Sequence, residues 1–315
     1  MNQSTSGITL ALTSYETLNQ TKNIFFIFIF LVYVASTLAN IFLMAIIFLE
    51  STLHKPMYIF LFNLACNGLI GSTTVWPKVM DNLLSNTWTI TYAGCLVQIF
   101  LLGVYATCTF TILTVMAYDR YVFIFMPLQY HNIMTPSKVK HLLVLSNLVP
   151  MCTVSGQVCL ASKLSLCRYT IHKLFCDNKS LTNLACAKNT LHHINSLYGI
   201  CIFVAFGIVI IFFVLLSYEK IILVIFRASK DAQRKAFVKC MPHLIVFVNF
   251  SLSSLFSIIH NQFPRYVPEQ LNAFLSVQFI LIPPLLHPII YGLKTDEIRN
   301  SIRRKVFAFS QAVWL

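Results

Sequence analysis

The sequence predicts an all-α membrane protein: a seven-transmembrane helix bundle followed by a short amphipathic helix at the C-terminal end. Two observations support this prediction. Of the 315 residues, 57% are hydrophobic and 10% are charged, whereas a soluble domain has roughly 25% charged residues. The chain also contains seven apolar stretches, each with the roughly 20 residues that a helix needs to cross about 30 Å of hydrocarbon. A helix is expected for each because it satisfies its own backbone hydrogen bonds in lipid.

The seven stretches divide the chain into three parts. The expected spans are residues 24–49, 57–80, 93–123, 139–161, 194–225, 237–260 and 270–293. We therefore expect an N-terminal tail at 1–23, a seven-helix domain at 24–293 and a C-terminal tail at 294–315. In the C-terminal tail, apolar residues fall on one helical face and basic residues on the other, which is typical of a helix lying on a membrane surface. The apolar residues are Ile298, Ile302, Val306 and Phe309, and the basic ones are Arg299, Arg303, Arg304 and Lys305.

The distribution of Lys and Arg predicts which side of the membrane each tail occupies. With the N-terminus outside, most of the 23 Lys and Arg residues fall on inner segments, as the positive-inside rule requires. The net charge of +13 would suggest nucleic acid as the partner of a soluble protein, but here basic inner loops facing anionic membrane lipid explain it better. We expect a multi-pass plasma-membrane protein with an extracellular N-terminus and no nucleic-acid partner. Sequons at Asn19 and Asn178 fall on the expected outer side and are candidate glycosylation sites.

The spans lack the side chains that other membrane-protein functions need. No Asp, Glu, Lys or Arg lies at the middle of an expected span, whereas ion pumps and coupled transporters usually carry ionisable residues there. The sequence has no HExxH or GxSxG motif and no paired acids within spans, which argues against an intramembrane hydrolase. We expect no enzymatic activity, no catalytic residues and no cofactor. A transporter or channel is the weaker alternative.

The ten cysteines fall into two groups. Four lie on the expected outer side, at Cys95, Cys167, Cys176 and Cys186. That surface is oxidising, so these four are compatible with two disulfides in any of three pairings. The other six lie in expected spans, where small buried hydrophobic residues are the favoured interpretation; they are Cys66, Cys108, Cys152, Cys159, Cys201 and Cys240. No ligand spacing supports a metal site formed by the loop cysteines with His172, His192 and His193.

Five motifs stand in order at the ends of expected spans. They are LHKPMY (53–58), MAYDRYV (116–122), SYEKII (217–222), KAFVKCMPHL (235–244) and PPLLHPIIYGLK (283–294). Together they resemble the motifs of the olfactory (odorant) receptors, a family of rhodopsin-like (class A) G-protein-coupled receptors. The resemblance extends from Asn40 to about Arg299. The Asn67-Gly68 pair and the YGLK ending resemble fish members of the family, which favours water-borne ligands.

The resemblance implies a function for the whole chain. A receptor of this family would bind a small organic odorant within the helix bundle and activate a stimulatory, olfactory-type heterotrimeric G protein, which raises cAMP. It would lie in the plasma membrane of olfactory sensory neuron cilia. The resemblance also implies one disulfide pairing, Cys95 with Cys176 and Cys167 with Cys186. The alternatives are a receptor-like protein that does not signal and, less favoured, a transporter or channel.

The resemblance implies a ligand pocket among four spans. On the third span, Gly103, Ala106, Thr107 and Phe110 have the i, i+3, i+4, i+7 spacing of one helix face. The matching family positions on the later spans are Ile202, Phe203, Phe206, Ser251, Ser254, Ile258 and Val277. These residues describe a small, mostly apolar pocket with a few hydroxyls, suited to a small organic molecule. For each of them, ordinary packing between helices is an equally good explanation.

The resemblance assigns coupling and switching roles to residues at the inner ends of spans. These residues are Asp119, Arg120, Tyr121, Tyr218, His243, His287, Pro288 and Tyr291. A partly desolvated guanidinium at the end of the third span needs an acceptor, and Asp119 is the nearest. Because adjacent residues do not share a helix face, their ion pair should be modest and breakable. Outward movement of the sixth helix would then turn Arg120 toward two tyrosines and open a cleft for a G-protein segment. The alternative is a simple anchor at the membrane interface.

The chain departs from the rhodopsin-like pattern at two positions. Many of these receptors have an Asp in the second span that holds a sodium ion, and here the matching residue is Gly68. The seventh-span motif Asn-Pro-x-x-Tyr reads His287-Pro288-Ile289-Ile290-Tyr291. These departures argue against a sodium site and leave the class unchanged. The inner end of the sixth span also carries Lys235 and Lys239 instead of an acid, so a salt bridge between the third and sixth helices is not expected.

Overall fold

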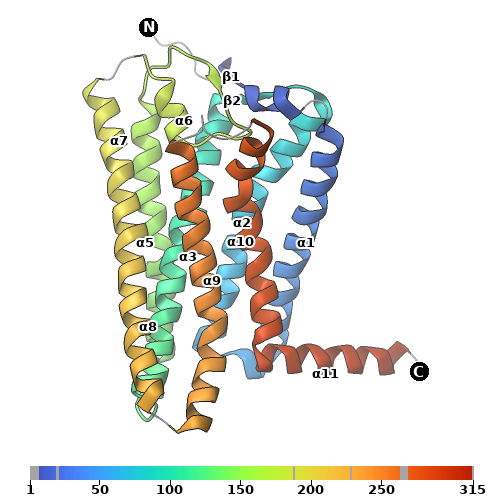
Figure 1. Cartoon of the computed structure of the whole chain (residues 1–315), viewed down its shortest axis with the longest axis vertical. Coiled ribbons are helices and arrows are strands. Elements are labelled where there is room, and N and C mark those ends of the chain that lie inside the picture. Colours follow the sequence, from blue (N-terminus) through green and yellow to red (C-terminus); the bar gives the residue numbers. More distant parts are fainter. Residues whose placement is uncertain (1–6, 19–20, 187–188, 228, 263–268, 314–315) are drawn as a thin grey trace.

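Seven helical rods lie side by side along the long axis of the molecule (Figure 1). The computed structural model describes residues 7–18, 21–186, 189–227, 229–262 and 269–313. Within these residues the rods are α1 (Lys22–Leu49), α2 (Pro56–Ser85), α3 (Tyr92–Phe125), α5 (Pro136–Ser162), the continuous run of α7 (Thr190–Ile202), η4 (Phe203–Val209) and α8 (Ile210–Arg227), α9 (Lys230–Gln262) and α10 (Glu269–Lys294). All seven are long and apolar enough to cross a membrane. The predicted all-α, seven-transmembrane fold class is confirmed.

Local sequence explains where several rods begin and end. Pro56 occupies the first turn of α2, where its missing N–H leaves no hydrogen bond unmade. The Thr91 hydroxyl caps α3 by accepting a hydrogen bond from the Gly94 N–H at 3.1 Å. Asn86 ends α2 in the left-handed conformation, with φ of 52°, a conformation that Asn tolerates better than most residues.

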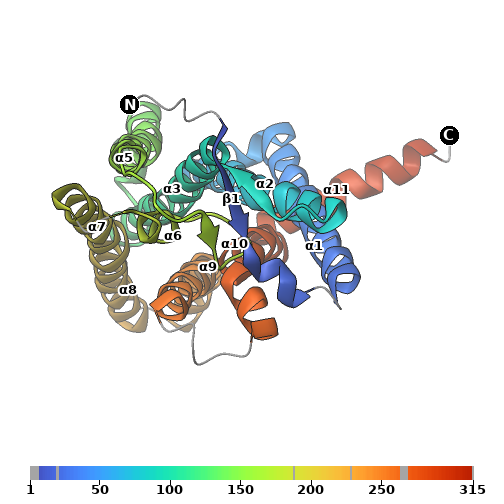
Figure 2. The same cartoon turned by 90° about the horizontal axis from the view of Figure 1, so that it is seen from above.

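A three-stranded sheet closes one end of the bundle, which we name the sheet end. Its strands are β1 (Thr9–Leu12), β2 (Thr89–Thr91) and β3 (Thr170–Ile171), in the order β2-β1-β3. The central strand β1 is antiparallel to β2 and parallel to β3, and it runs across the middle of this end when the molecule is seen from above (Figure 2). Leu10 and Leu12 are 0% and 1% exposed, so the inward face of β1 seals the apolar core beneath it.

The expected N-terminal tail at 1–23 therefore contains ordered structure. After β1, the 3₁₀-helix η2 (Thr13–Leu18) packs over the same end of the bundle. The Tyr15 hydroxyl donates a hydrogen bond to the Leu174 carbonyl oxygen at 2.8 Å, and its ring stacks on Trp88 with centroids 6.5 Å apart. The N-terminal segment is thus part of the cap that covers the sheet end.

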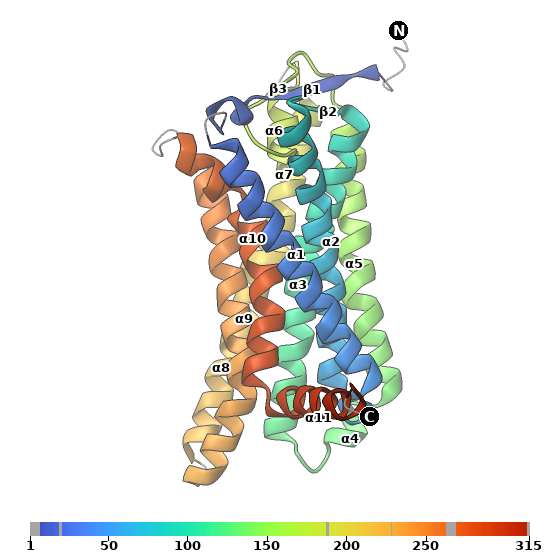
Figure 3. The ribbon, with the colours of Figure 1, turned by 90° about the vertical axis from the view of Figure 1, so that its right-hand side faces the viewer.

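The other end of the bundle, which we name the α11 end, carries a helix that leaves the bundle sideways (Figures 1 and 3). This helix is α11 (Asp296–Val313). Elsewhere in the described part of the chain there are three further short helices, η3 (Ser51–Leu53), α4 (Tyr130–Ile133) and α6 (Asn178–Asn183). Ile298 and Ser301 are buried against the bundle, whereas Arg303 and Lys305 are exposed. This arrangement is the expected amphipathic helix. Of the residues expected on its apolar face, Val306 and Phe309 lie outside the described side chains.

The bundle has an apolar core at each end and an apolar outer surface. The core of the α11 end surrounds Tyr58 and Met116, and the core of the sheet end surrounds Trp76. On the outer surface, large apolar side chains are widely exposed; Phe48 and Phe226, for example, are 72% and 73% exposed. Such a surface suits lipid, which covers apolar side chains without any protein partner.

The cysteines of the spans occupy two different environments. Cys108 and Cys240 are buried, and Cys66 is half-buried. By contrast, the three cysteines on the outer faces of the fourth and fifth rods are exposed, and they are Cys152, Cys159 and Cys201. The expectation that these three are buried is wrong. Their rods are only 17% and 11% buried over their most apolar windows, and lipid accommodates a small apolar thiol as well as a protein core does.

Close contact between α2 and α3 depends on a glycine. A Cβ atom added to Gly71 would lie 2.5 Å from the Tyr105 ring, which is itself 1% exposed. We expect Gly71→Ala to destabilise the bundle by about 1–3 kcal/mol, because the ring has no space into which it can move. The measurement is the thermal unfolding midpoint of the detergent-purified protein, which should fall by several degrees. Gly292→Ala is the control, since a Cβ there meets nothing within 4 Å; equal losses in both variants would contradict the packing argument.

Candidate functional site

A cavity of about 520 Å³ lies at the α11 end of the bundle. Residues from α2, α3, α4, α9, α10 and α11 line it, so it is formed by segments far apart in the sequence. Its charged, polar and aromatic lining residues include Lys55, Tyr58, Arg120, Phe123, Tyr130, Lys239, Lys294 and Glu297. Arg120 is among them, and it forms an ion pair with Asp119.

The structure brings Asp119 and Arg120 together in an almost buried ion pair. Arg120 Nη2 lies 3.3 Å from Asp119 Oδ2, and the two side chains are 10% and 1% exposed. The Tyr130 hydroxyl donates a hydrogen bond to Asp119 Oδ1 at 2.7 Å, a contact that the sequence did not predict. The guanidinium carbon also lies 5.8 Å from the centroid of the Phe123 ring. Because both charges are removed from water, each one depends on the other for compensation.

The sixth rod contributes no acid to this pair within the part of the chain that the structure describes. Lys239 of α9 faces the cavity instead, with its Nζ 4.7 Å from the centroid of the Phe123 ring. Arg120 Nε is buried and makes no hydrogen bond. The geometry agrees with the expectation that no salt bridge joins the third and sixth helices.

A neutral hydrogen-bonded chain joins α3, α8 and α9 instead. His243 Nε2 lies 2.9 Å from the Leu113 carbonyl oxygen, and His243 Nδ1 contacts the Tyr218 hydroxyl. A carbonyl oxygen can only accept, so Nε2 carries the proton and Nδ1 accepts from Tyr218. His243 is 0% exposed and Tyr218 is 3% exposed. These two side chains therefore tie the fifth and sixth rods to the third, one turn or more above Arg120.

The other switch residues are less well connected. His287 and Tyr291 are buried on α10, and within the described part of the chain His287 Nε2 and the Tyr291 hydroxyl have no hydrogen-bond partner. Pro288 lies between them and is buried. Tyr121 is half-buried, stacks on Phe125 with ring centroids 4.3 Å apart and does not line the cavity.

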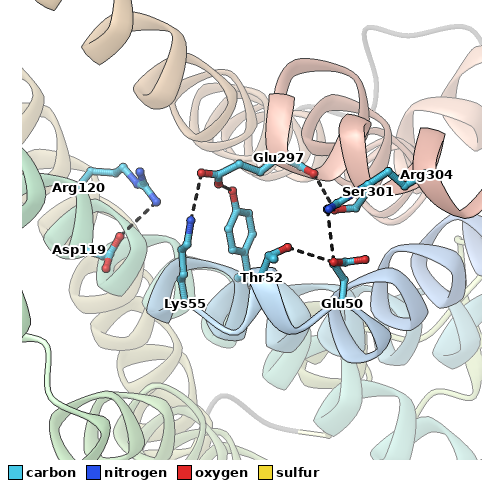
Figure 4. Close-up of polar contacts among 9 residues, drawn as sticks. Glu50, Thr52, Lys55, Asp119, Arg120, Glu297, Ser301 and Arg304 are labelled. Atoms are coloured by element: carbon cyan, nitrogen blue, oxygen red, sulfur yellow. Dashed lines mark hydrogen bonds and ion pairs between the residues drawn. The ribbon is translucent and has the colours of Figure 1, made fainter.

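The wall formed by α2 and α11 carries a second group of charges (Figure 4). Lys55 Nζ lies 3.2 Å from Glu297 Oε1, and the Tyr58 hydroxyl donates to Glu297 Oε2. Burial tends to raise the pKa of Glu297, but the hydrogen bonds from Tyr58 and Lys55 and the charge of Lys55 outweigh it and lower the pKa below its ordinary value. Burial and the charge and hydrogen bond of Asp119 raise the pKa of Tyr130. Glu297 is therefore a carboxylate and Tyr130 a neutral donor at neutral pH.

Two disulfides hold the loop at the sheet end. They join Cys95 to Cys176 and Cys167 to Cys186, the same pairs that the resemblance implies. The Cys176 N–H donates a hydrogen bond to Gln98 Oε1 at 2.7 Å, which fixes the loop to the start of α3. Burial acts to raise the pKa of Asp177, but the charge of Lys173 and hydrogen bonds from Lys173 and Ser180 lower it overall.

The ligand residues expected on α3 do not share one environment. A Cβ on Gly103 would lie 2.7 Å from Val154 Cγ1, so Gly103 packs against α5. Close approach of two helices explains the glycine, and its place in a ligand pocket stays a prediction. The Thr107 hydroxyl donates to the Gly103 carbonyl oxygen at 2.7 Å, and Phe110 packs edge-on against Phe250 with centroids 4.8 Å apart. Ala106 is half-buried.

The expected ligand residues on the later rods are spread along the upper half of the bundle. Ile202, Phe203, Phe206 and Ile258 are half-buried, and Val277 is buried in the sheet-end core. The first three lie at or within the π-helical segment η4, which the sequence did not predict. The Ser254 hydroxyl donates to the Phe250 carbonyl oxygen at 2.7 Å, whereas the half-buried Ser251 has its hydroxyl oxygen buried without a partner. Ser251 is thus the better placed hydroxyl for a ligand.

A group of side-chain amides at the sheet end was missed by sequence reasoning. Asn195 is 0% exposed, and its Nδ2 donates to Thr182 Oγ1 at 2.9 Å, while its Oδ1 has no partner. A Cβ on Gly199, one turn further along α7, would lie 2.9 Å from Gln157 Nε2 and 3.7 Å from Asn178 Nδ2. The amides of α5, α6 and α7 therefore converge around Gly199. No sequence signal joins them, because they stand on three separate elements.

The same geometry bears on the candidate glycosylation sites. Asn178 is the first residue of α6, is half-buried and has its Oδ1 buried without a partner. A glycan on Asn178 would have to lie between helices. Asn19 lies outside the described residues. Glycosylation at either residue stays a prediction.

Neutral side chains occupy the centre of the bundle where a sodium ion would need a carboxylate. Asn67 Nδ2 donates to the Tyr105 carbonyl oxygen and to Thr109 Oγ1, both at 2.9 Å. A Cβ on Gly68 would lie 3.3 Å from Asn40 Oδ1. Within the described residues, no group of three or more His, Cys, Asp or Glu side chains could hold a metal ion.

Comparison with known proteins places this geometry in a family. The family model described as "Olfactory receptor" matches residues 28–308. "Olfactory receptor-like protein COR2" of Gallus gallus is 33% identical over 298 residues, which is 93% of this chain and 91% of that protein. "Olfactory receptor 52B2" of Homo sapiens is 31% identical over 280 residues, which is 88% of this chain and 85% of the human protein.

Solved structures agree on the fold. The crystal structure of squid rhodopsin superposes with a TM-score of 0.70 at 17% identity, over 88% of this chain and 78% of the rhodopsin. The relatives are receptors and not enzymes, and the likeness to rhodopsin concerns the seven-helix fold. The chain is a multi-pass membrane protein that belongs to the olfactory receptor family.

Proposed function

We propose that this protein is an odorant receptor that binds a small organic molecule within the bundle and activates a stimulatory, olfactory-type heterotrimeric G protein, which raises cAMP. The observation that carries the proposal is the cavity at the α11 end, with Arg120 at its wall. The guanidinium is held by a single breakable ion pair with Asp119. A cavity lined by an arginine that can change partner is suited to receive a segment of a second protein when the rods separate.

Two independent features support the proposed orientation of the protein in the membrane. Disulfides form and persist in oxidising compartments, and both disulfides lie at the sheet end. The α11 end carries most of the basic residues that the positive-inside rule assigns to the cytoplasm. The proposal therefore places the N-terminus outside the cell, α11 on the anionic inner leaflet and the protein in the plasma membrane of olfactory cilia.

The ligand would bind in the upper half of the bundle. Among the described residues there, the Ser251 hydroxyl and the Oδ1 atoms of Asn178 and Asn195 are buried without a hydrogen-bond partner. Around them, Ala106, Phe206 and Ile258 supply half-buried apolar surface. Such a combination suits a small molecule with an apolar body and a hydroxyl, carbonyl or amide group.

The experiment that tests the proposal is a cAMP assay. Cells that express the protein with a stimulatory olfactory-type G protein would be exposed to a panel of small water-soluble alcohols, aldehydes, acids and amides. A saturable rise in cAMP that untransfected cells lack would support the proposal. Surface-expressed protein that binds panel members without any cAMP response would favour the alternative of a receptor-like protein that does not signal. Ligand or ion flux would favour a transporter or channel.

The Asp119–Arg120 pair gives a prediction about the unstimulated receptor. Asp119→Asn removes the charge that holds Arg120, and agonist-free cAMP per surface receptor should rise. Because the pair is almost buried, its loss should cost more than the roughly 1 kcal/mol of a surface pair, so the rise should be about fivefold or more. Tyr130→Phe, which removes the hydroxyl that donates to Asp119, should shift basal cAMP in the same direction by a smaller amount. Basal cAMP that is unchanged or lower in surface-expressed Asp119→Asn would contradict the restraining role of the pair.

A further inference from the structure

The wall of the cavity opposite Lys239 contains a carboxylate to which the proposed function assigns no role. Glu297 lies in the first turn of α11, and it reaches Lys55 and Tyr58 at the start of α2 (Figure 4). Tyr58 is 4% exposed, so its hydroxyl approaches Glu297 from inside the bundle. All three side chains line the same cavity as Arg120.

The charges of the cavity are unevenly compensated. Its cations are Lys55, Arg120, Lys239 and Lys294. Among the described residues, Lys55 is paired with Glu297 and Arg120 with Asp119, whereas Lys239 and Lys294 have no ion-pair partner. Asp296, the other acid of the lining, is paired with Arg299 of the same helix, which does not line the cavity. The α9–α10 side of the cavity is therefore positive, and Glu297 is the lining acid that neutralises a lining cation, Lys55.

Glu297 keeps its charge in this environment. The hydrogen bonds from Tyr58 and Lys55 and the Lys55 charge lower its pKa despite partial burial. The helix N-terminus on which it stands also favours an anion. At neutral pH the cavity thus holds a fixed negative charge at its rim, although its unpaired groups are cations.

We propose that Glu297 limits the affinity of the cavity for an acid-bearing segment of its partner. The carboxylate does so in two ways, by neutralising Lys55 and by repelling a second acidic group at the rim. This inference rests on the proposed function, because the partner is the G-protein segment that enters beside Arg120. Glu297 is a specificity-determining residue in this proposal: it keeps coupling low until the partner also gains contacts that a conformational change provides.

A second carboxylate supplies a matched control. Glu50 Oε1 lies 3.3 Å from Arg304 Nη2 and accepts a hydrogen bond from the Thr52 hydroxyl at 3.3 Å. Arg304 also donates to Ser301 Oγ at 3.2 Å, and Ser301 Oγ donates to the Glu297 carbonyl oxygen at 2.9 Å. Glu50 therefore ties the same helix to the same region of the bundle, but it does not line the cavity. A role in holding α11 would be shared by both acids, whereas a charge effect on the partner would belong to Glu297.

The test measures nucleotide exchange without agonist. Membranes containing each full-length variant would be mixed with purified stimulatory heterotrimer, and exchange would be normalised to surface receptor. Glu297→Gln keeps an acceptor for Tyr58 but frees the Lys55 charge, so exchange should rise about two- to fivefold at low salt. The gain should shrink at about 0.3 M salt because screening shortens the range of charge interactions. Glu50→Gln should leave exchange per receptor unchanged, and Glu297→Gln should give no gain in a Lys55→Gln background.

Each remaining outcome counts against one proposal or the other. Equal losses in Glu297→Gln and Glu50→Gln, or a gain that persists at high salt or without Lys55, would overturn the charge mechanism. Arg120→Ala in the same membranes separates the two proposals. If Arg120→Ala loses exchange and Glu297→Gln gains none, the inference about Glu297 is wrong and the proposed function stands. If Arg120→Ala exchanges as well as wild type, the proposed function itself is wrong.

Discussion

Replacing Arg120 with Ala is expected to remove agonist-stimulated cAMP while the receptor still reaches the cell surface. The guanidinium lines the cavity at the α11 end, and among the described residues its ion-pair partner is Asp119. Its contact with the G protein would form in the active state, so its removal weakens both the active conformation and the coupling. Coupling free energies between sites are typically about 1–3 kcal/mol, which corresponds to a loss of roughly 5- to 150-fold in signalling efficiency. The measurement is a cAMP dose–response curve at matched surface levels.

Two comparisons make this result specific. Arg303→Ala removes an exposed arginine of α11 outside the cavity and should signal normally. Stabilisation of purified Arg120→Ala by its odorant should persist, because the ligand would bind at the opposite half of the bundle. A surface-expressed Arg120→Ala that signals like wild type would show that Asp119 and Arg120 only anchor α3 at the membrane interface.

Loss of the Cys95–Cys176 disulfide is expected to have the largest effect on folding. The bridge joins the start of α3 to the loop that covers the bundle, and it closes 81 residues of chain. Restricting a loop of this length in the unfolded chain stabilises the fold by about 2–4 kcal/mol or slightly more. The double variant Cys95→Ala/Cys176→Ala leaves no unpaired thiol in the loop. Its surface level, measured by flow cytometry on an N-terminal tag, should fall to near background.

The other cysteines provide graded controls. Cys167 and Cys186 close 19 residues, so their removal should cost about 1 kcal/mol less than removal of the first bridge. Cys152→Ala changes an exposed thiol on the outer face of α5 and should leave surface level unchanged. Surface levels that fall equally in all three variants would show that cysteine substitution in general, and not the bridge, impairs folding.

The rods could be predicted from the sequence because a membrane span needs only length and low charge, which composition reports directly. The strands of the sheet end could not be predicted from the sequence. Leu10 and Leu12 alternate over just four residues of β1, a signal too short to separate from a polar tail. The orientation of residues within the rods was equally inaccessible: Cys152 faces outward while Cys108 is buried, although both stand in uninterrupted apolar sequence. In lipid, both faces of a helix are apolar. The sequence therefore lacks the alternation of polar and apolar residues that identifies the buried face of a helix in a soluble protein.

The sequence predicted those contacts of the candidate site that join residues adjacent in the chain. Asp119 and Arg120 are adjacent in the sequence, and burial at the end of a span predicts their pairing. Tyr130 contacts Asp119 across the turn that follows α3, 11 residues away, and Glu297 contacts Tyr58 from 239 residues away. No spacing rule brings either pair together. Gly103 shows what spacing leaves open: its helical spacing matches a pocket face, but the sequence does not reveal its close approach to Val154.

The π-helical segment Phe203–Val209 sets the rotational phase of the fifth rod. A π turn accommodates one residue more than an α turn, and each extra residue rotates the rest of a helix by about 100°. The angle about the helix axis between Asn195 on α7 and Tyr218 on α8 therefore differs from the angle expected for an unbroken α-helix. Deletion of a single residue within the segment would turn Asn195 and Gly199 away from α5 and α6 while leaving Tyr218 against His243. The rotation introduced by the π-helical segment thus allows α7 to contact α5 and α6 while α8 contacts α9.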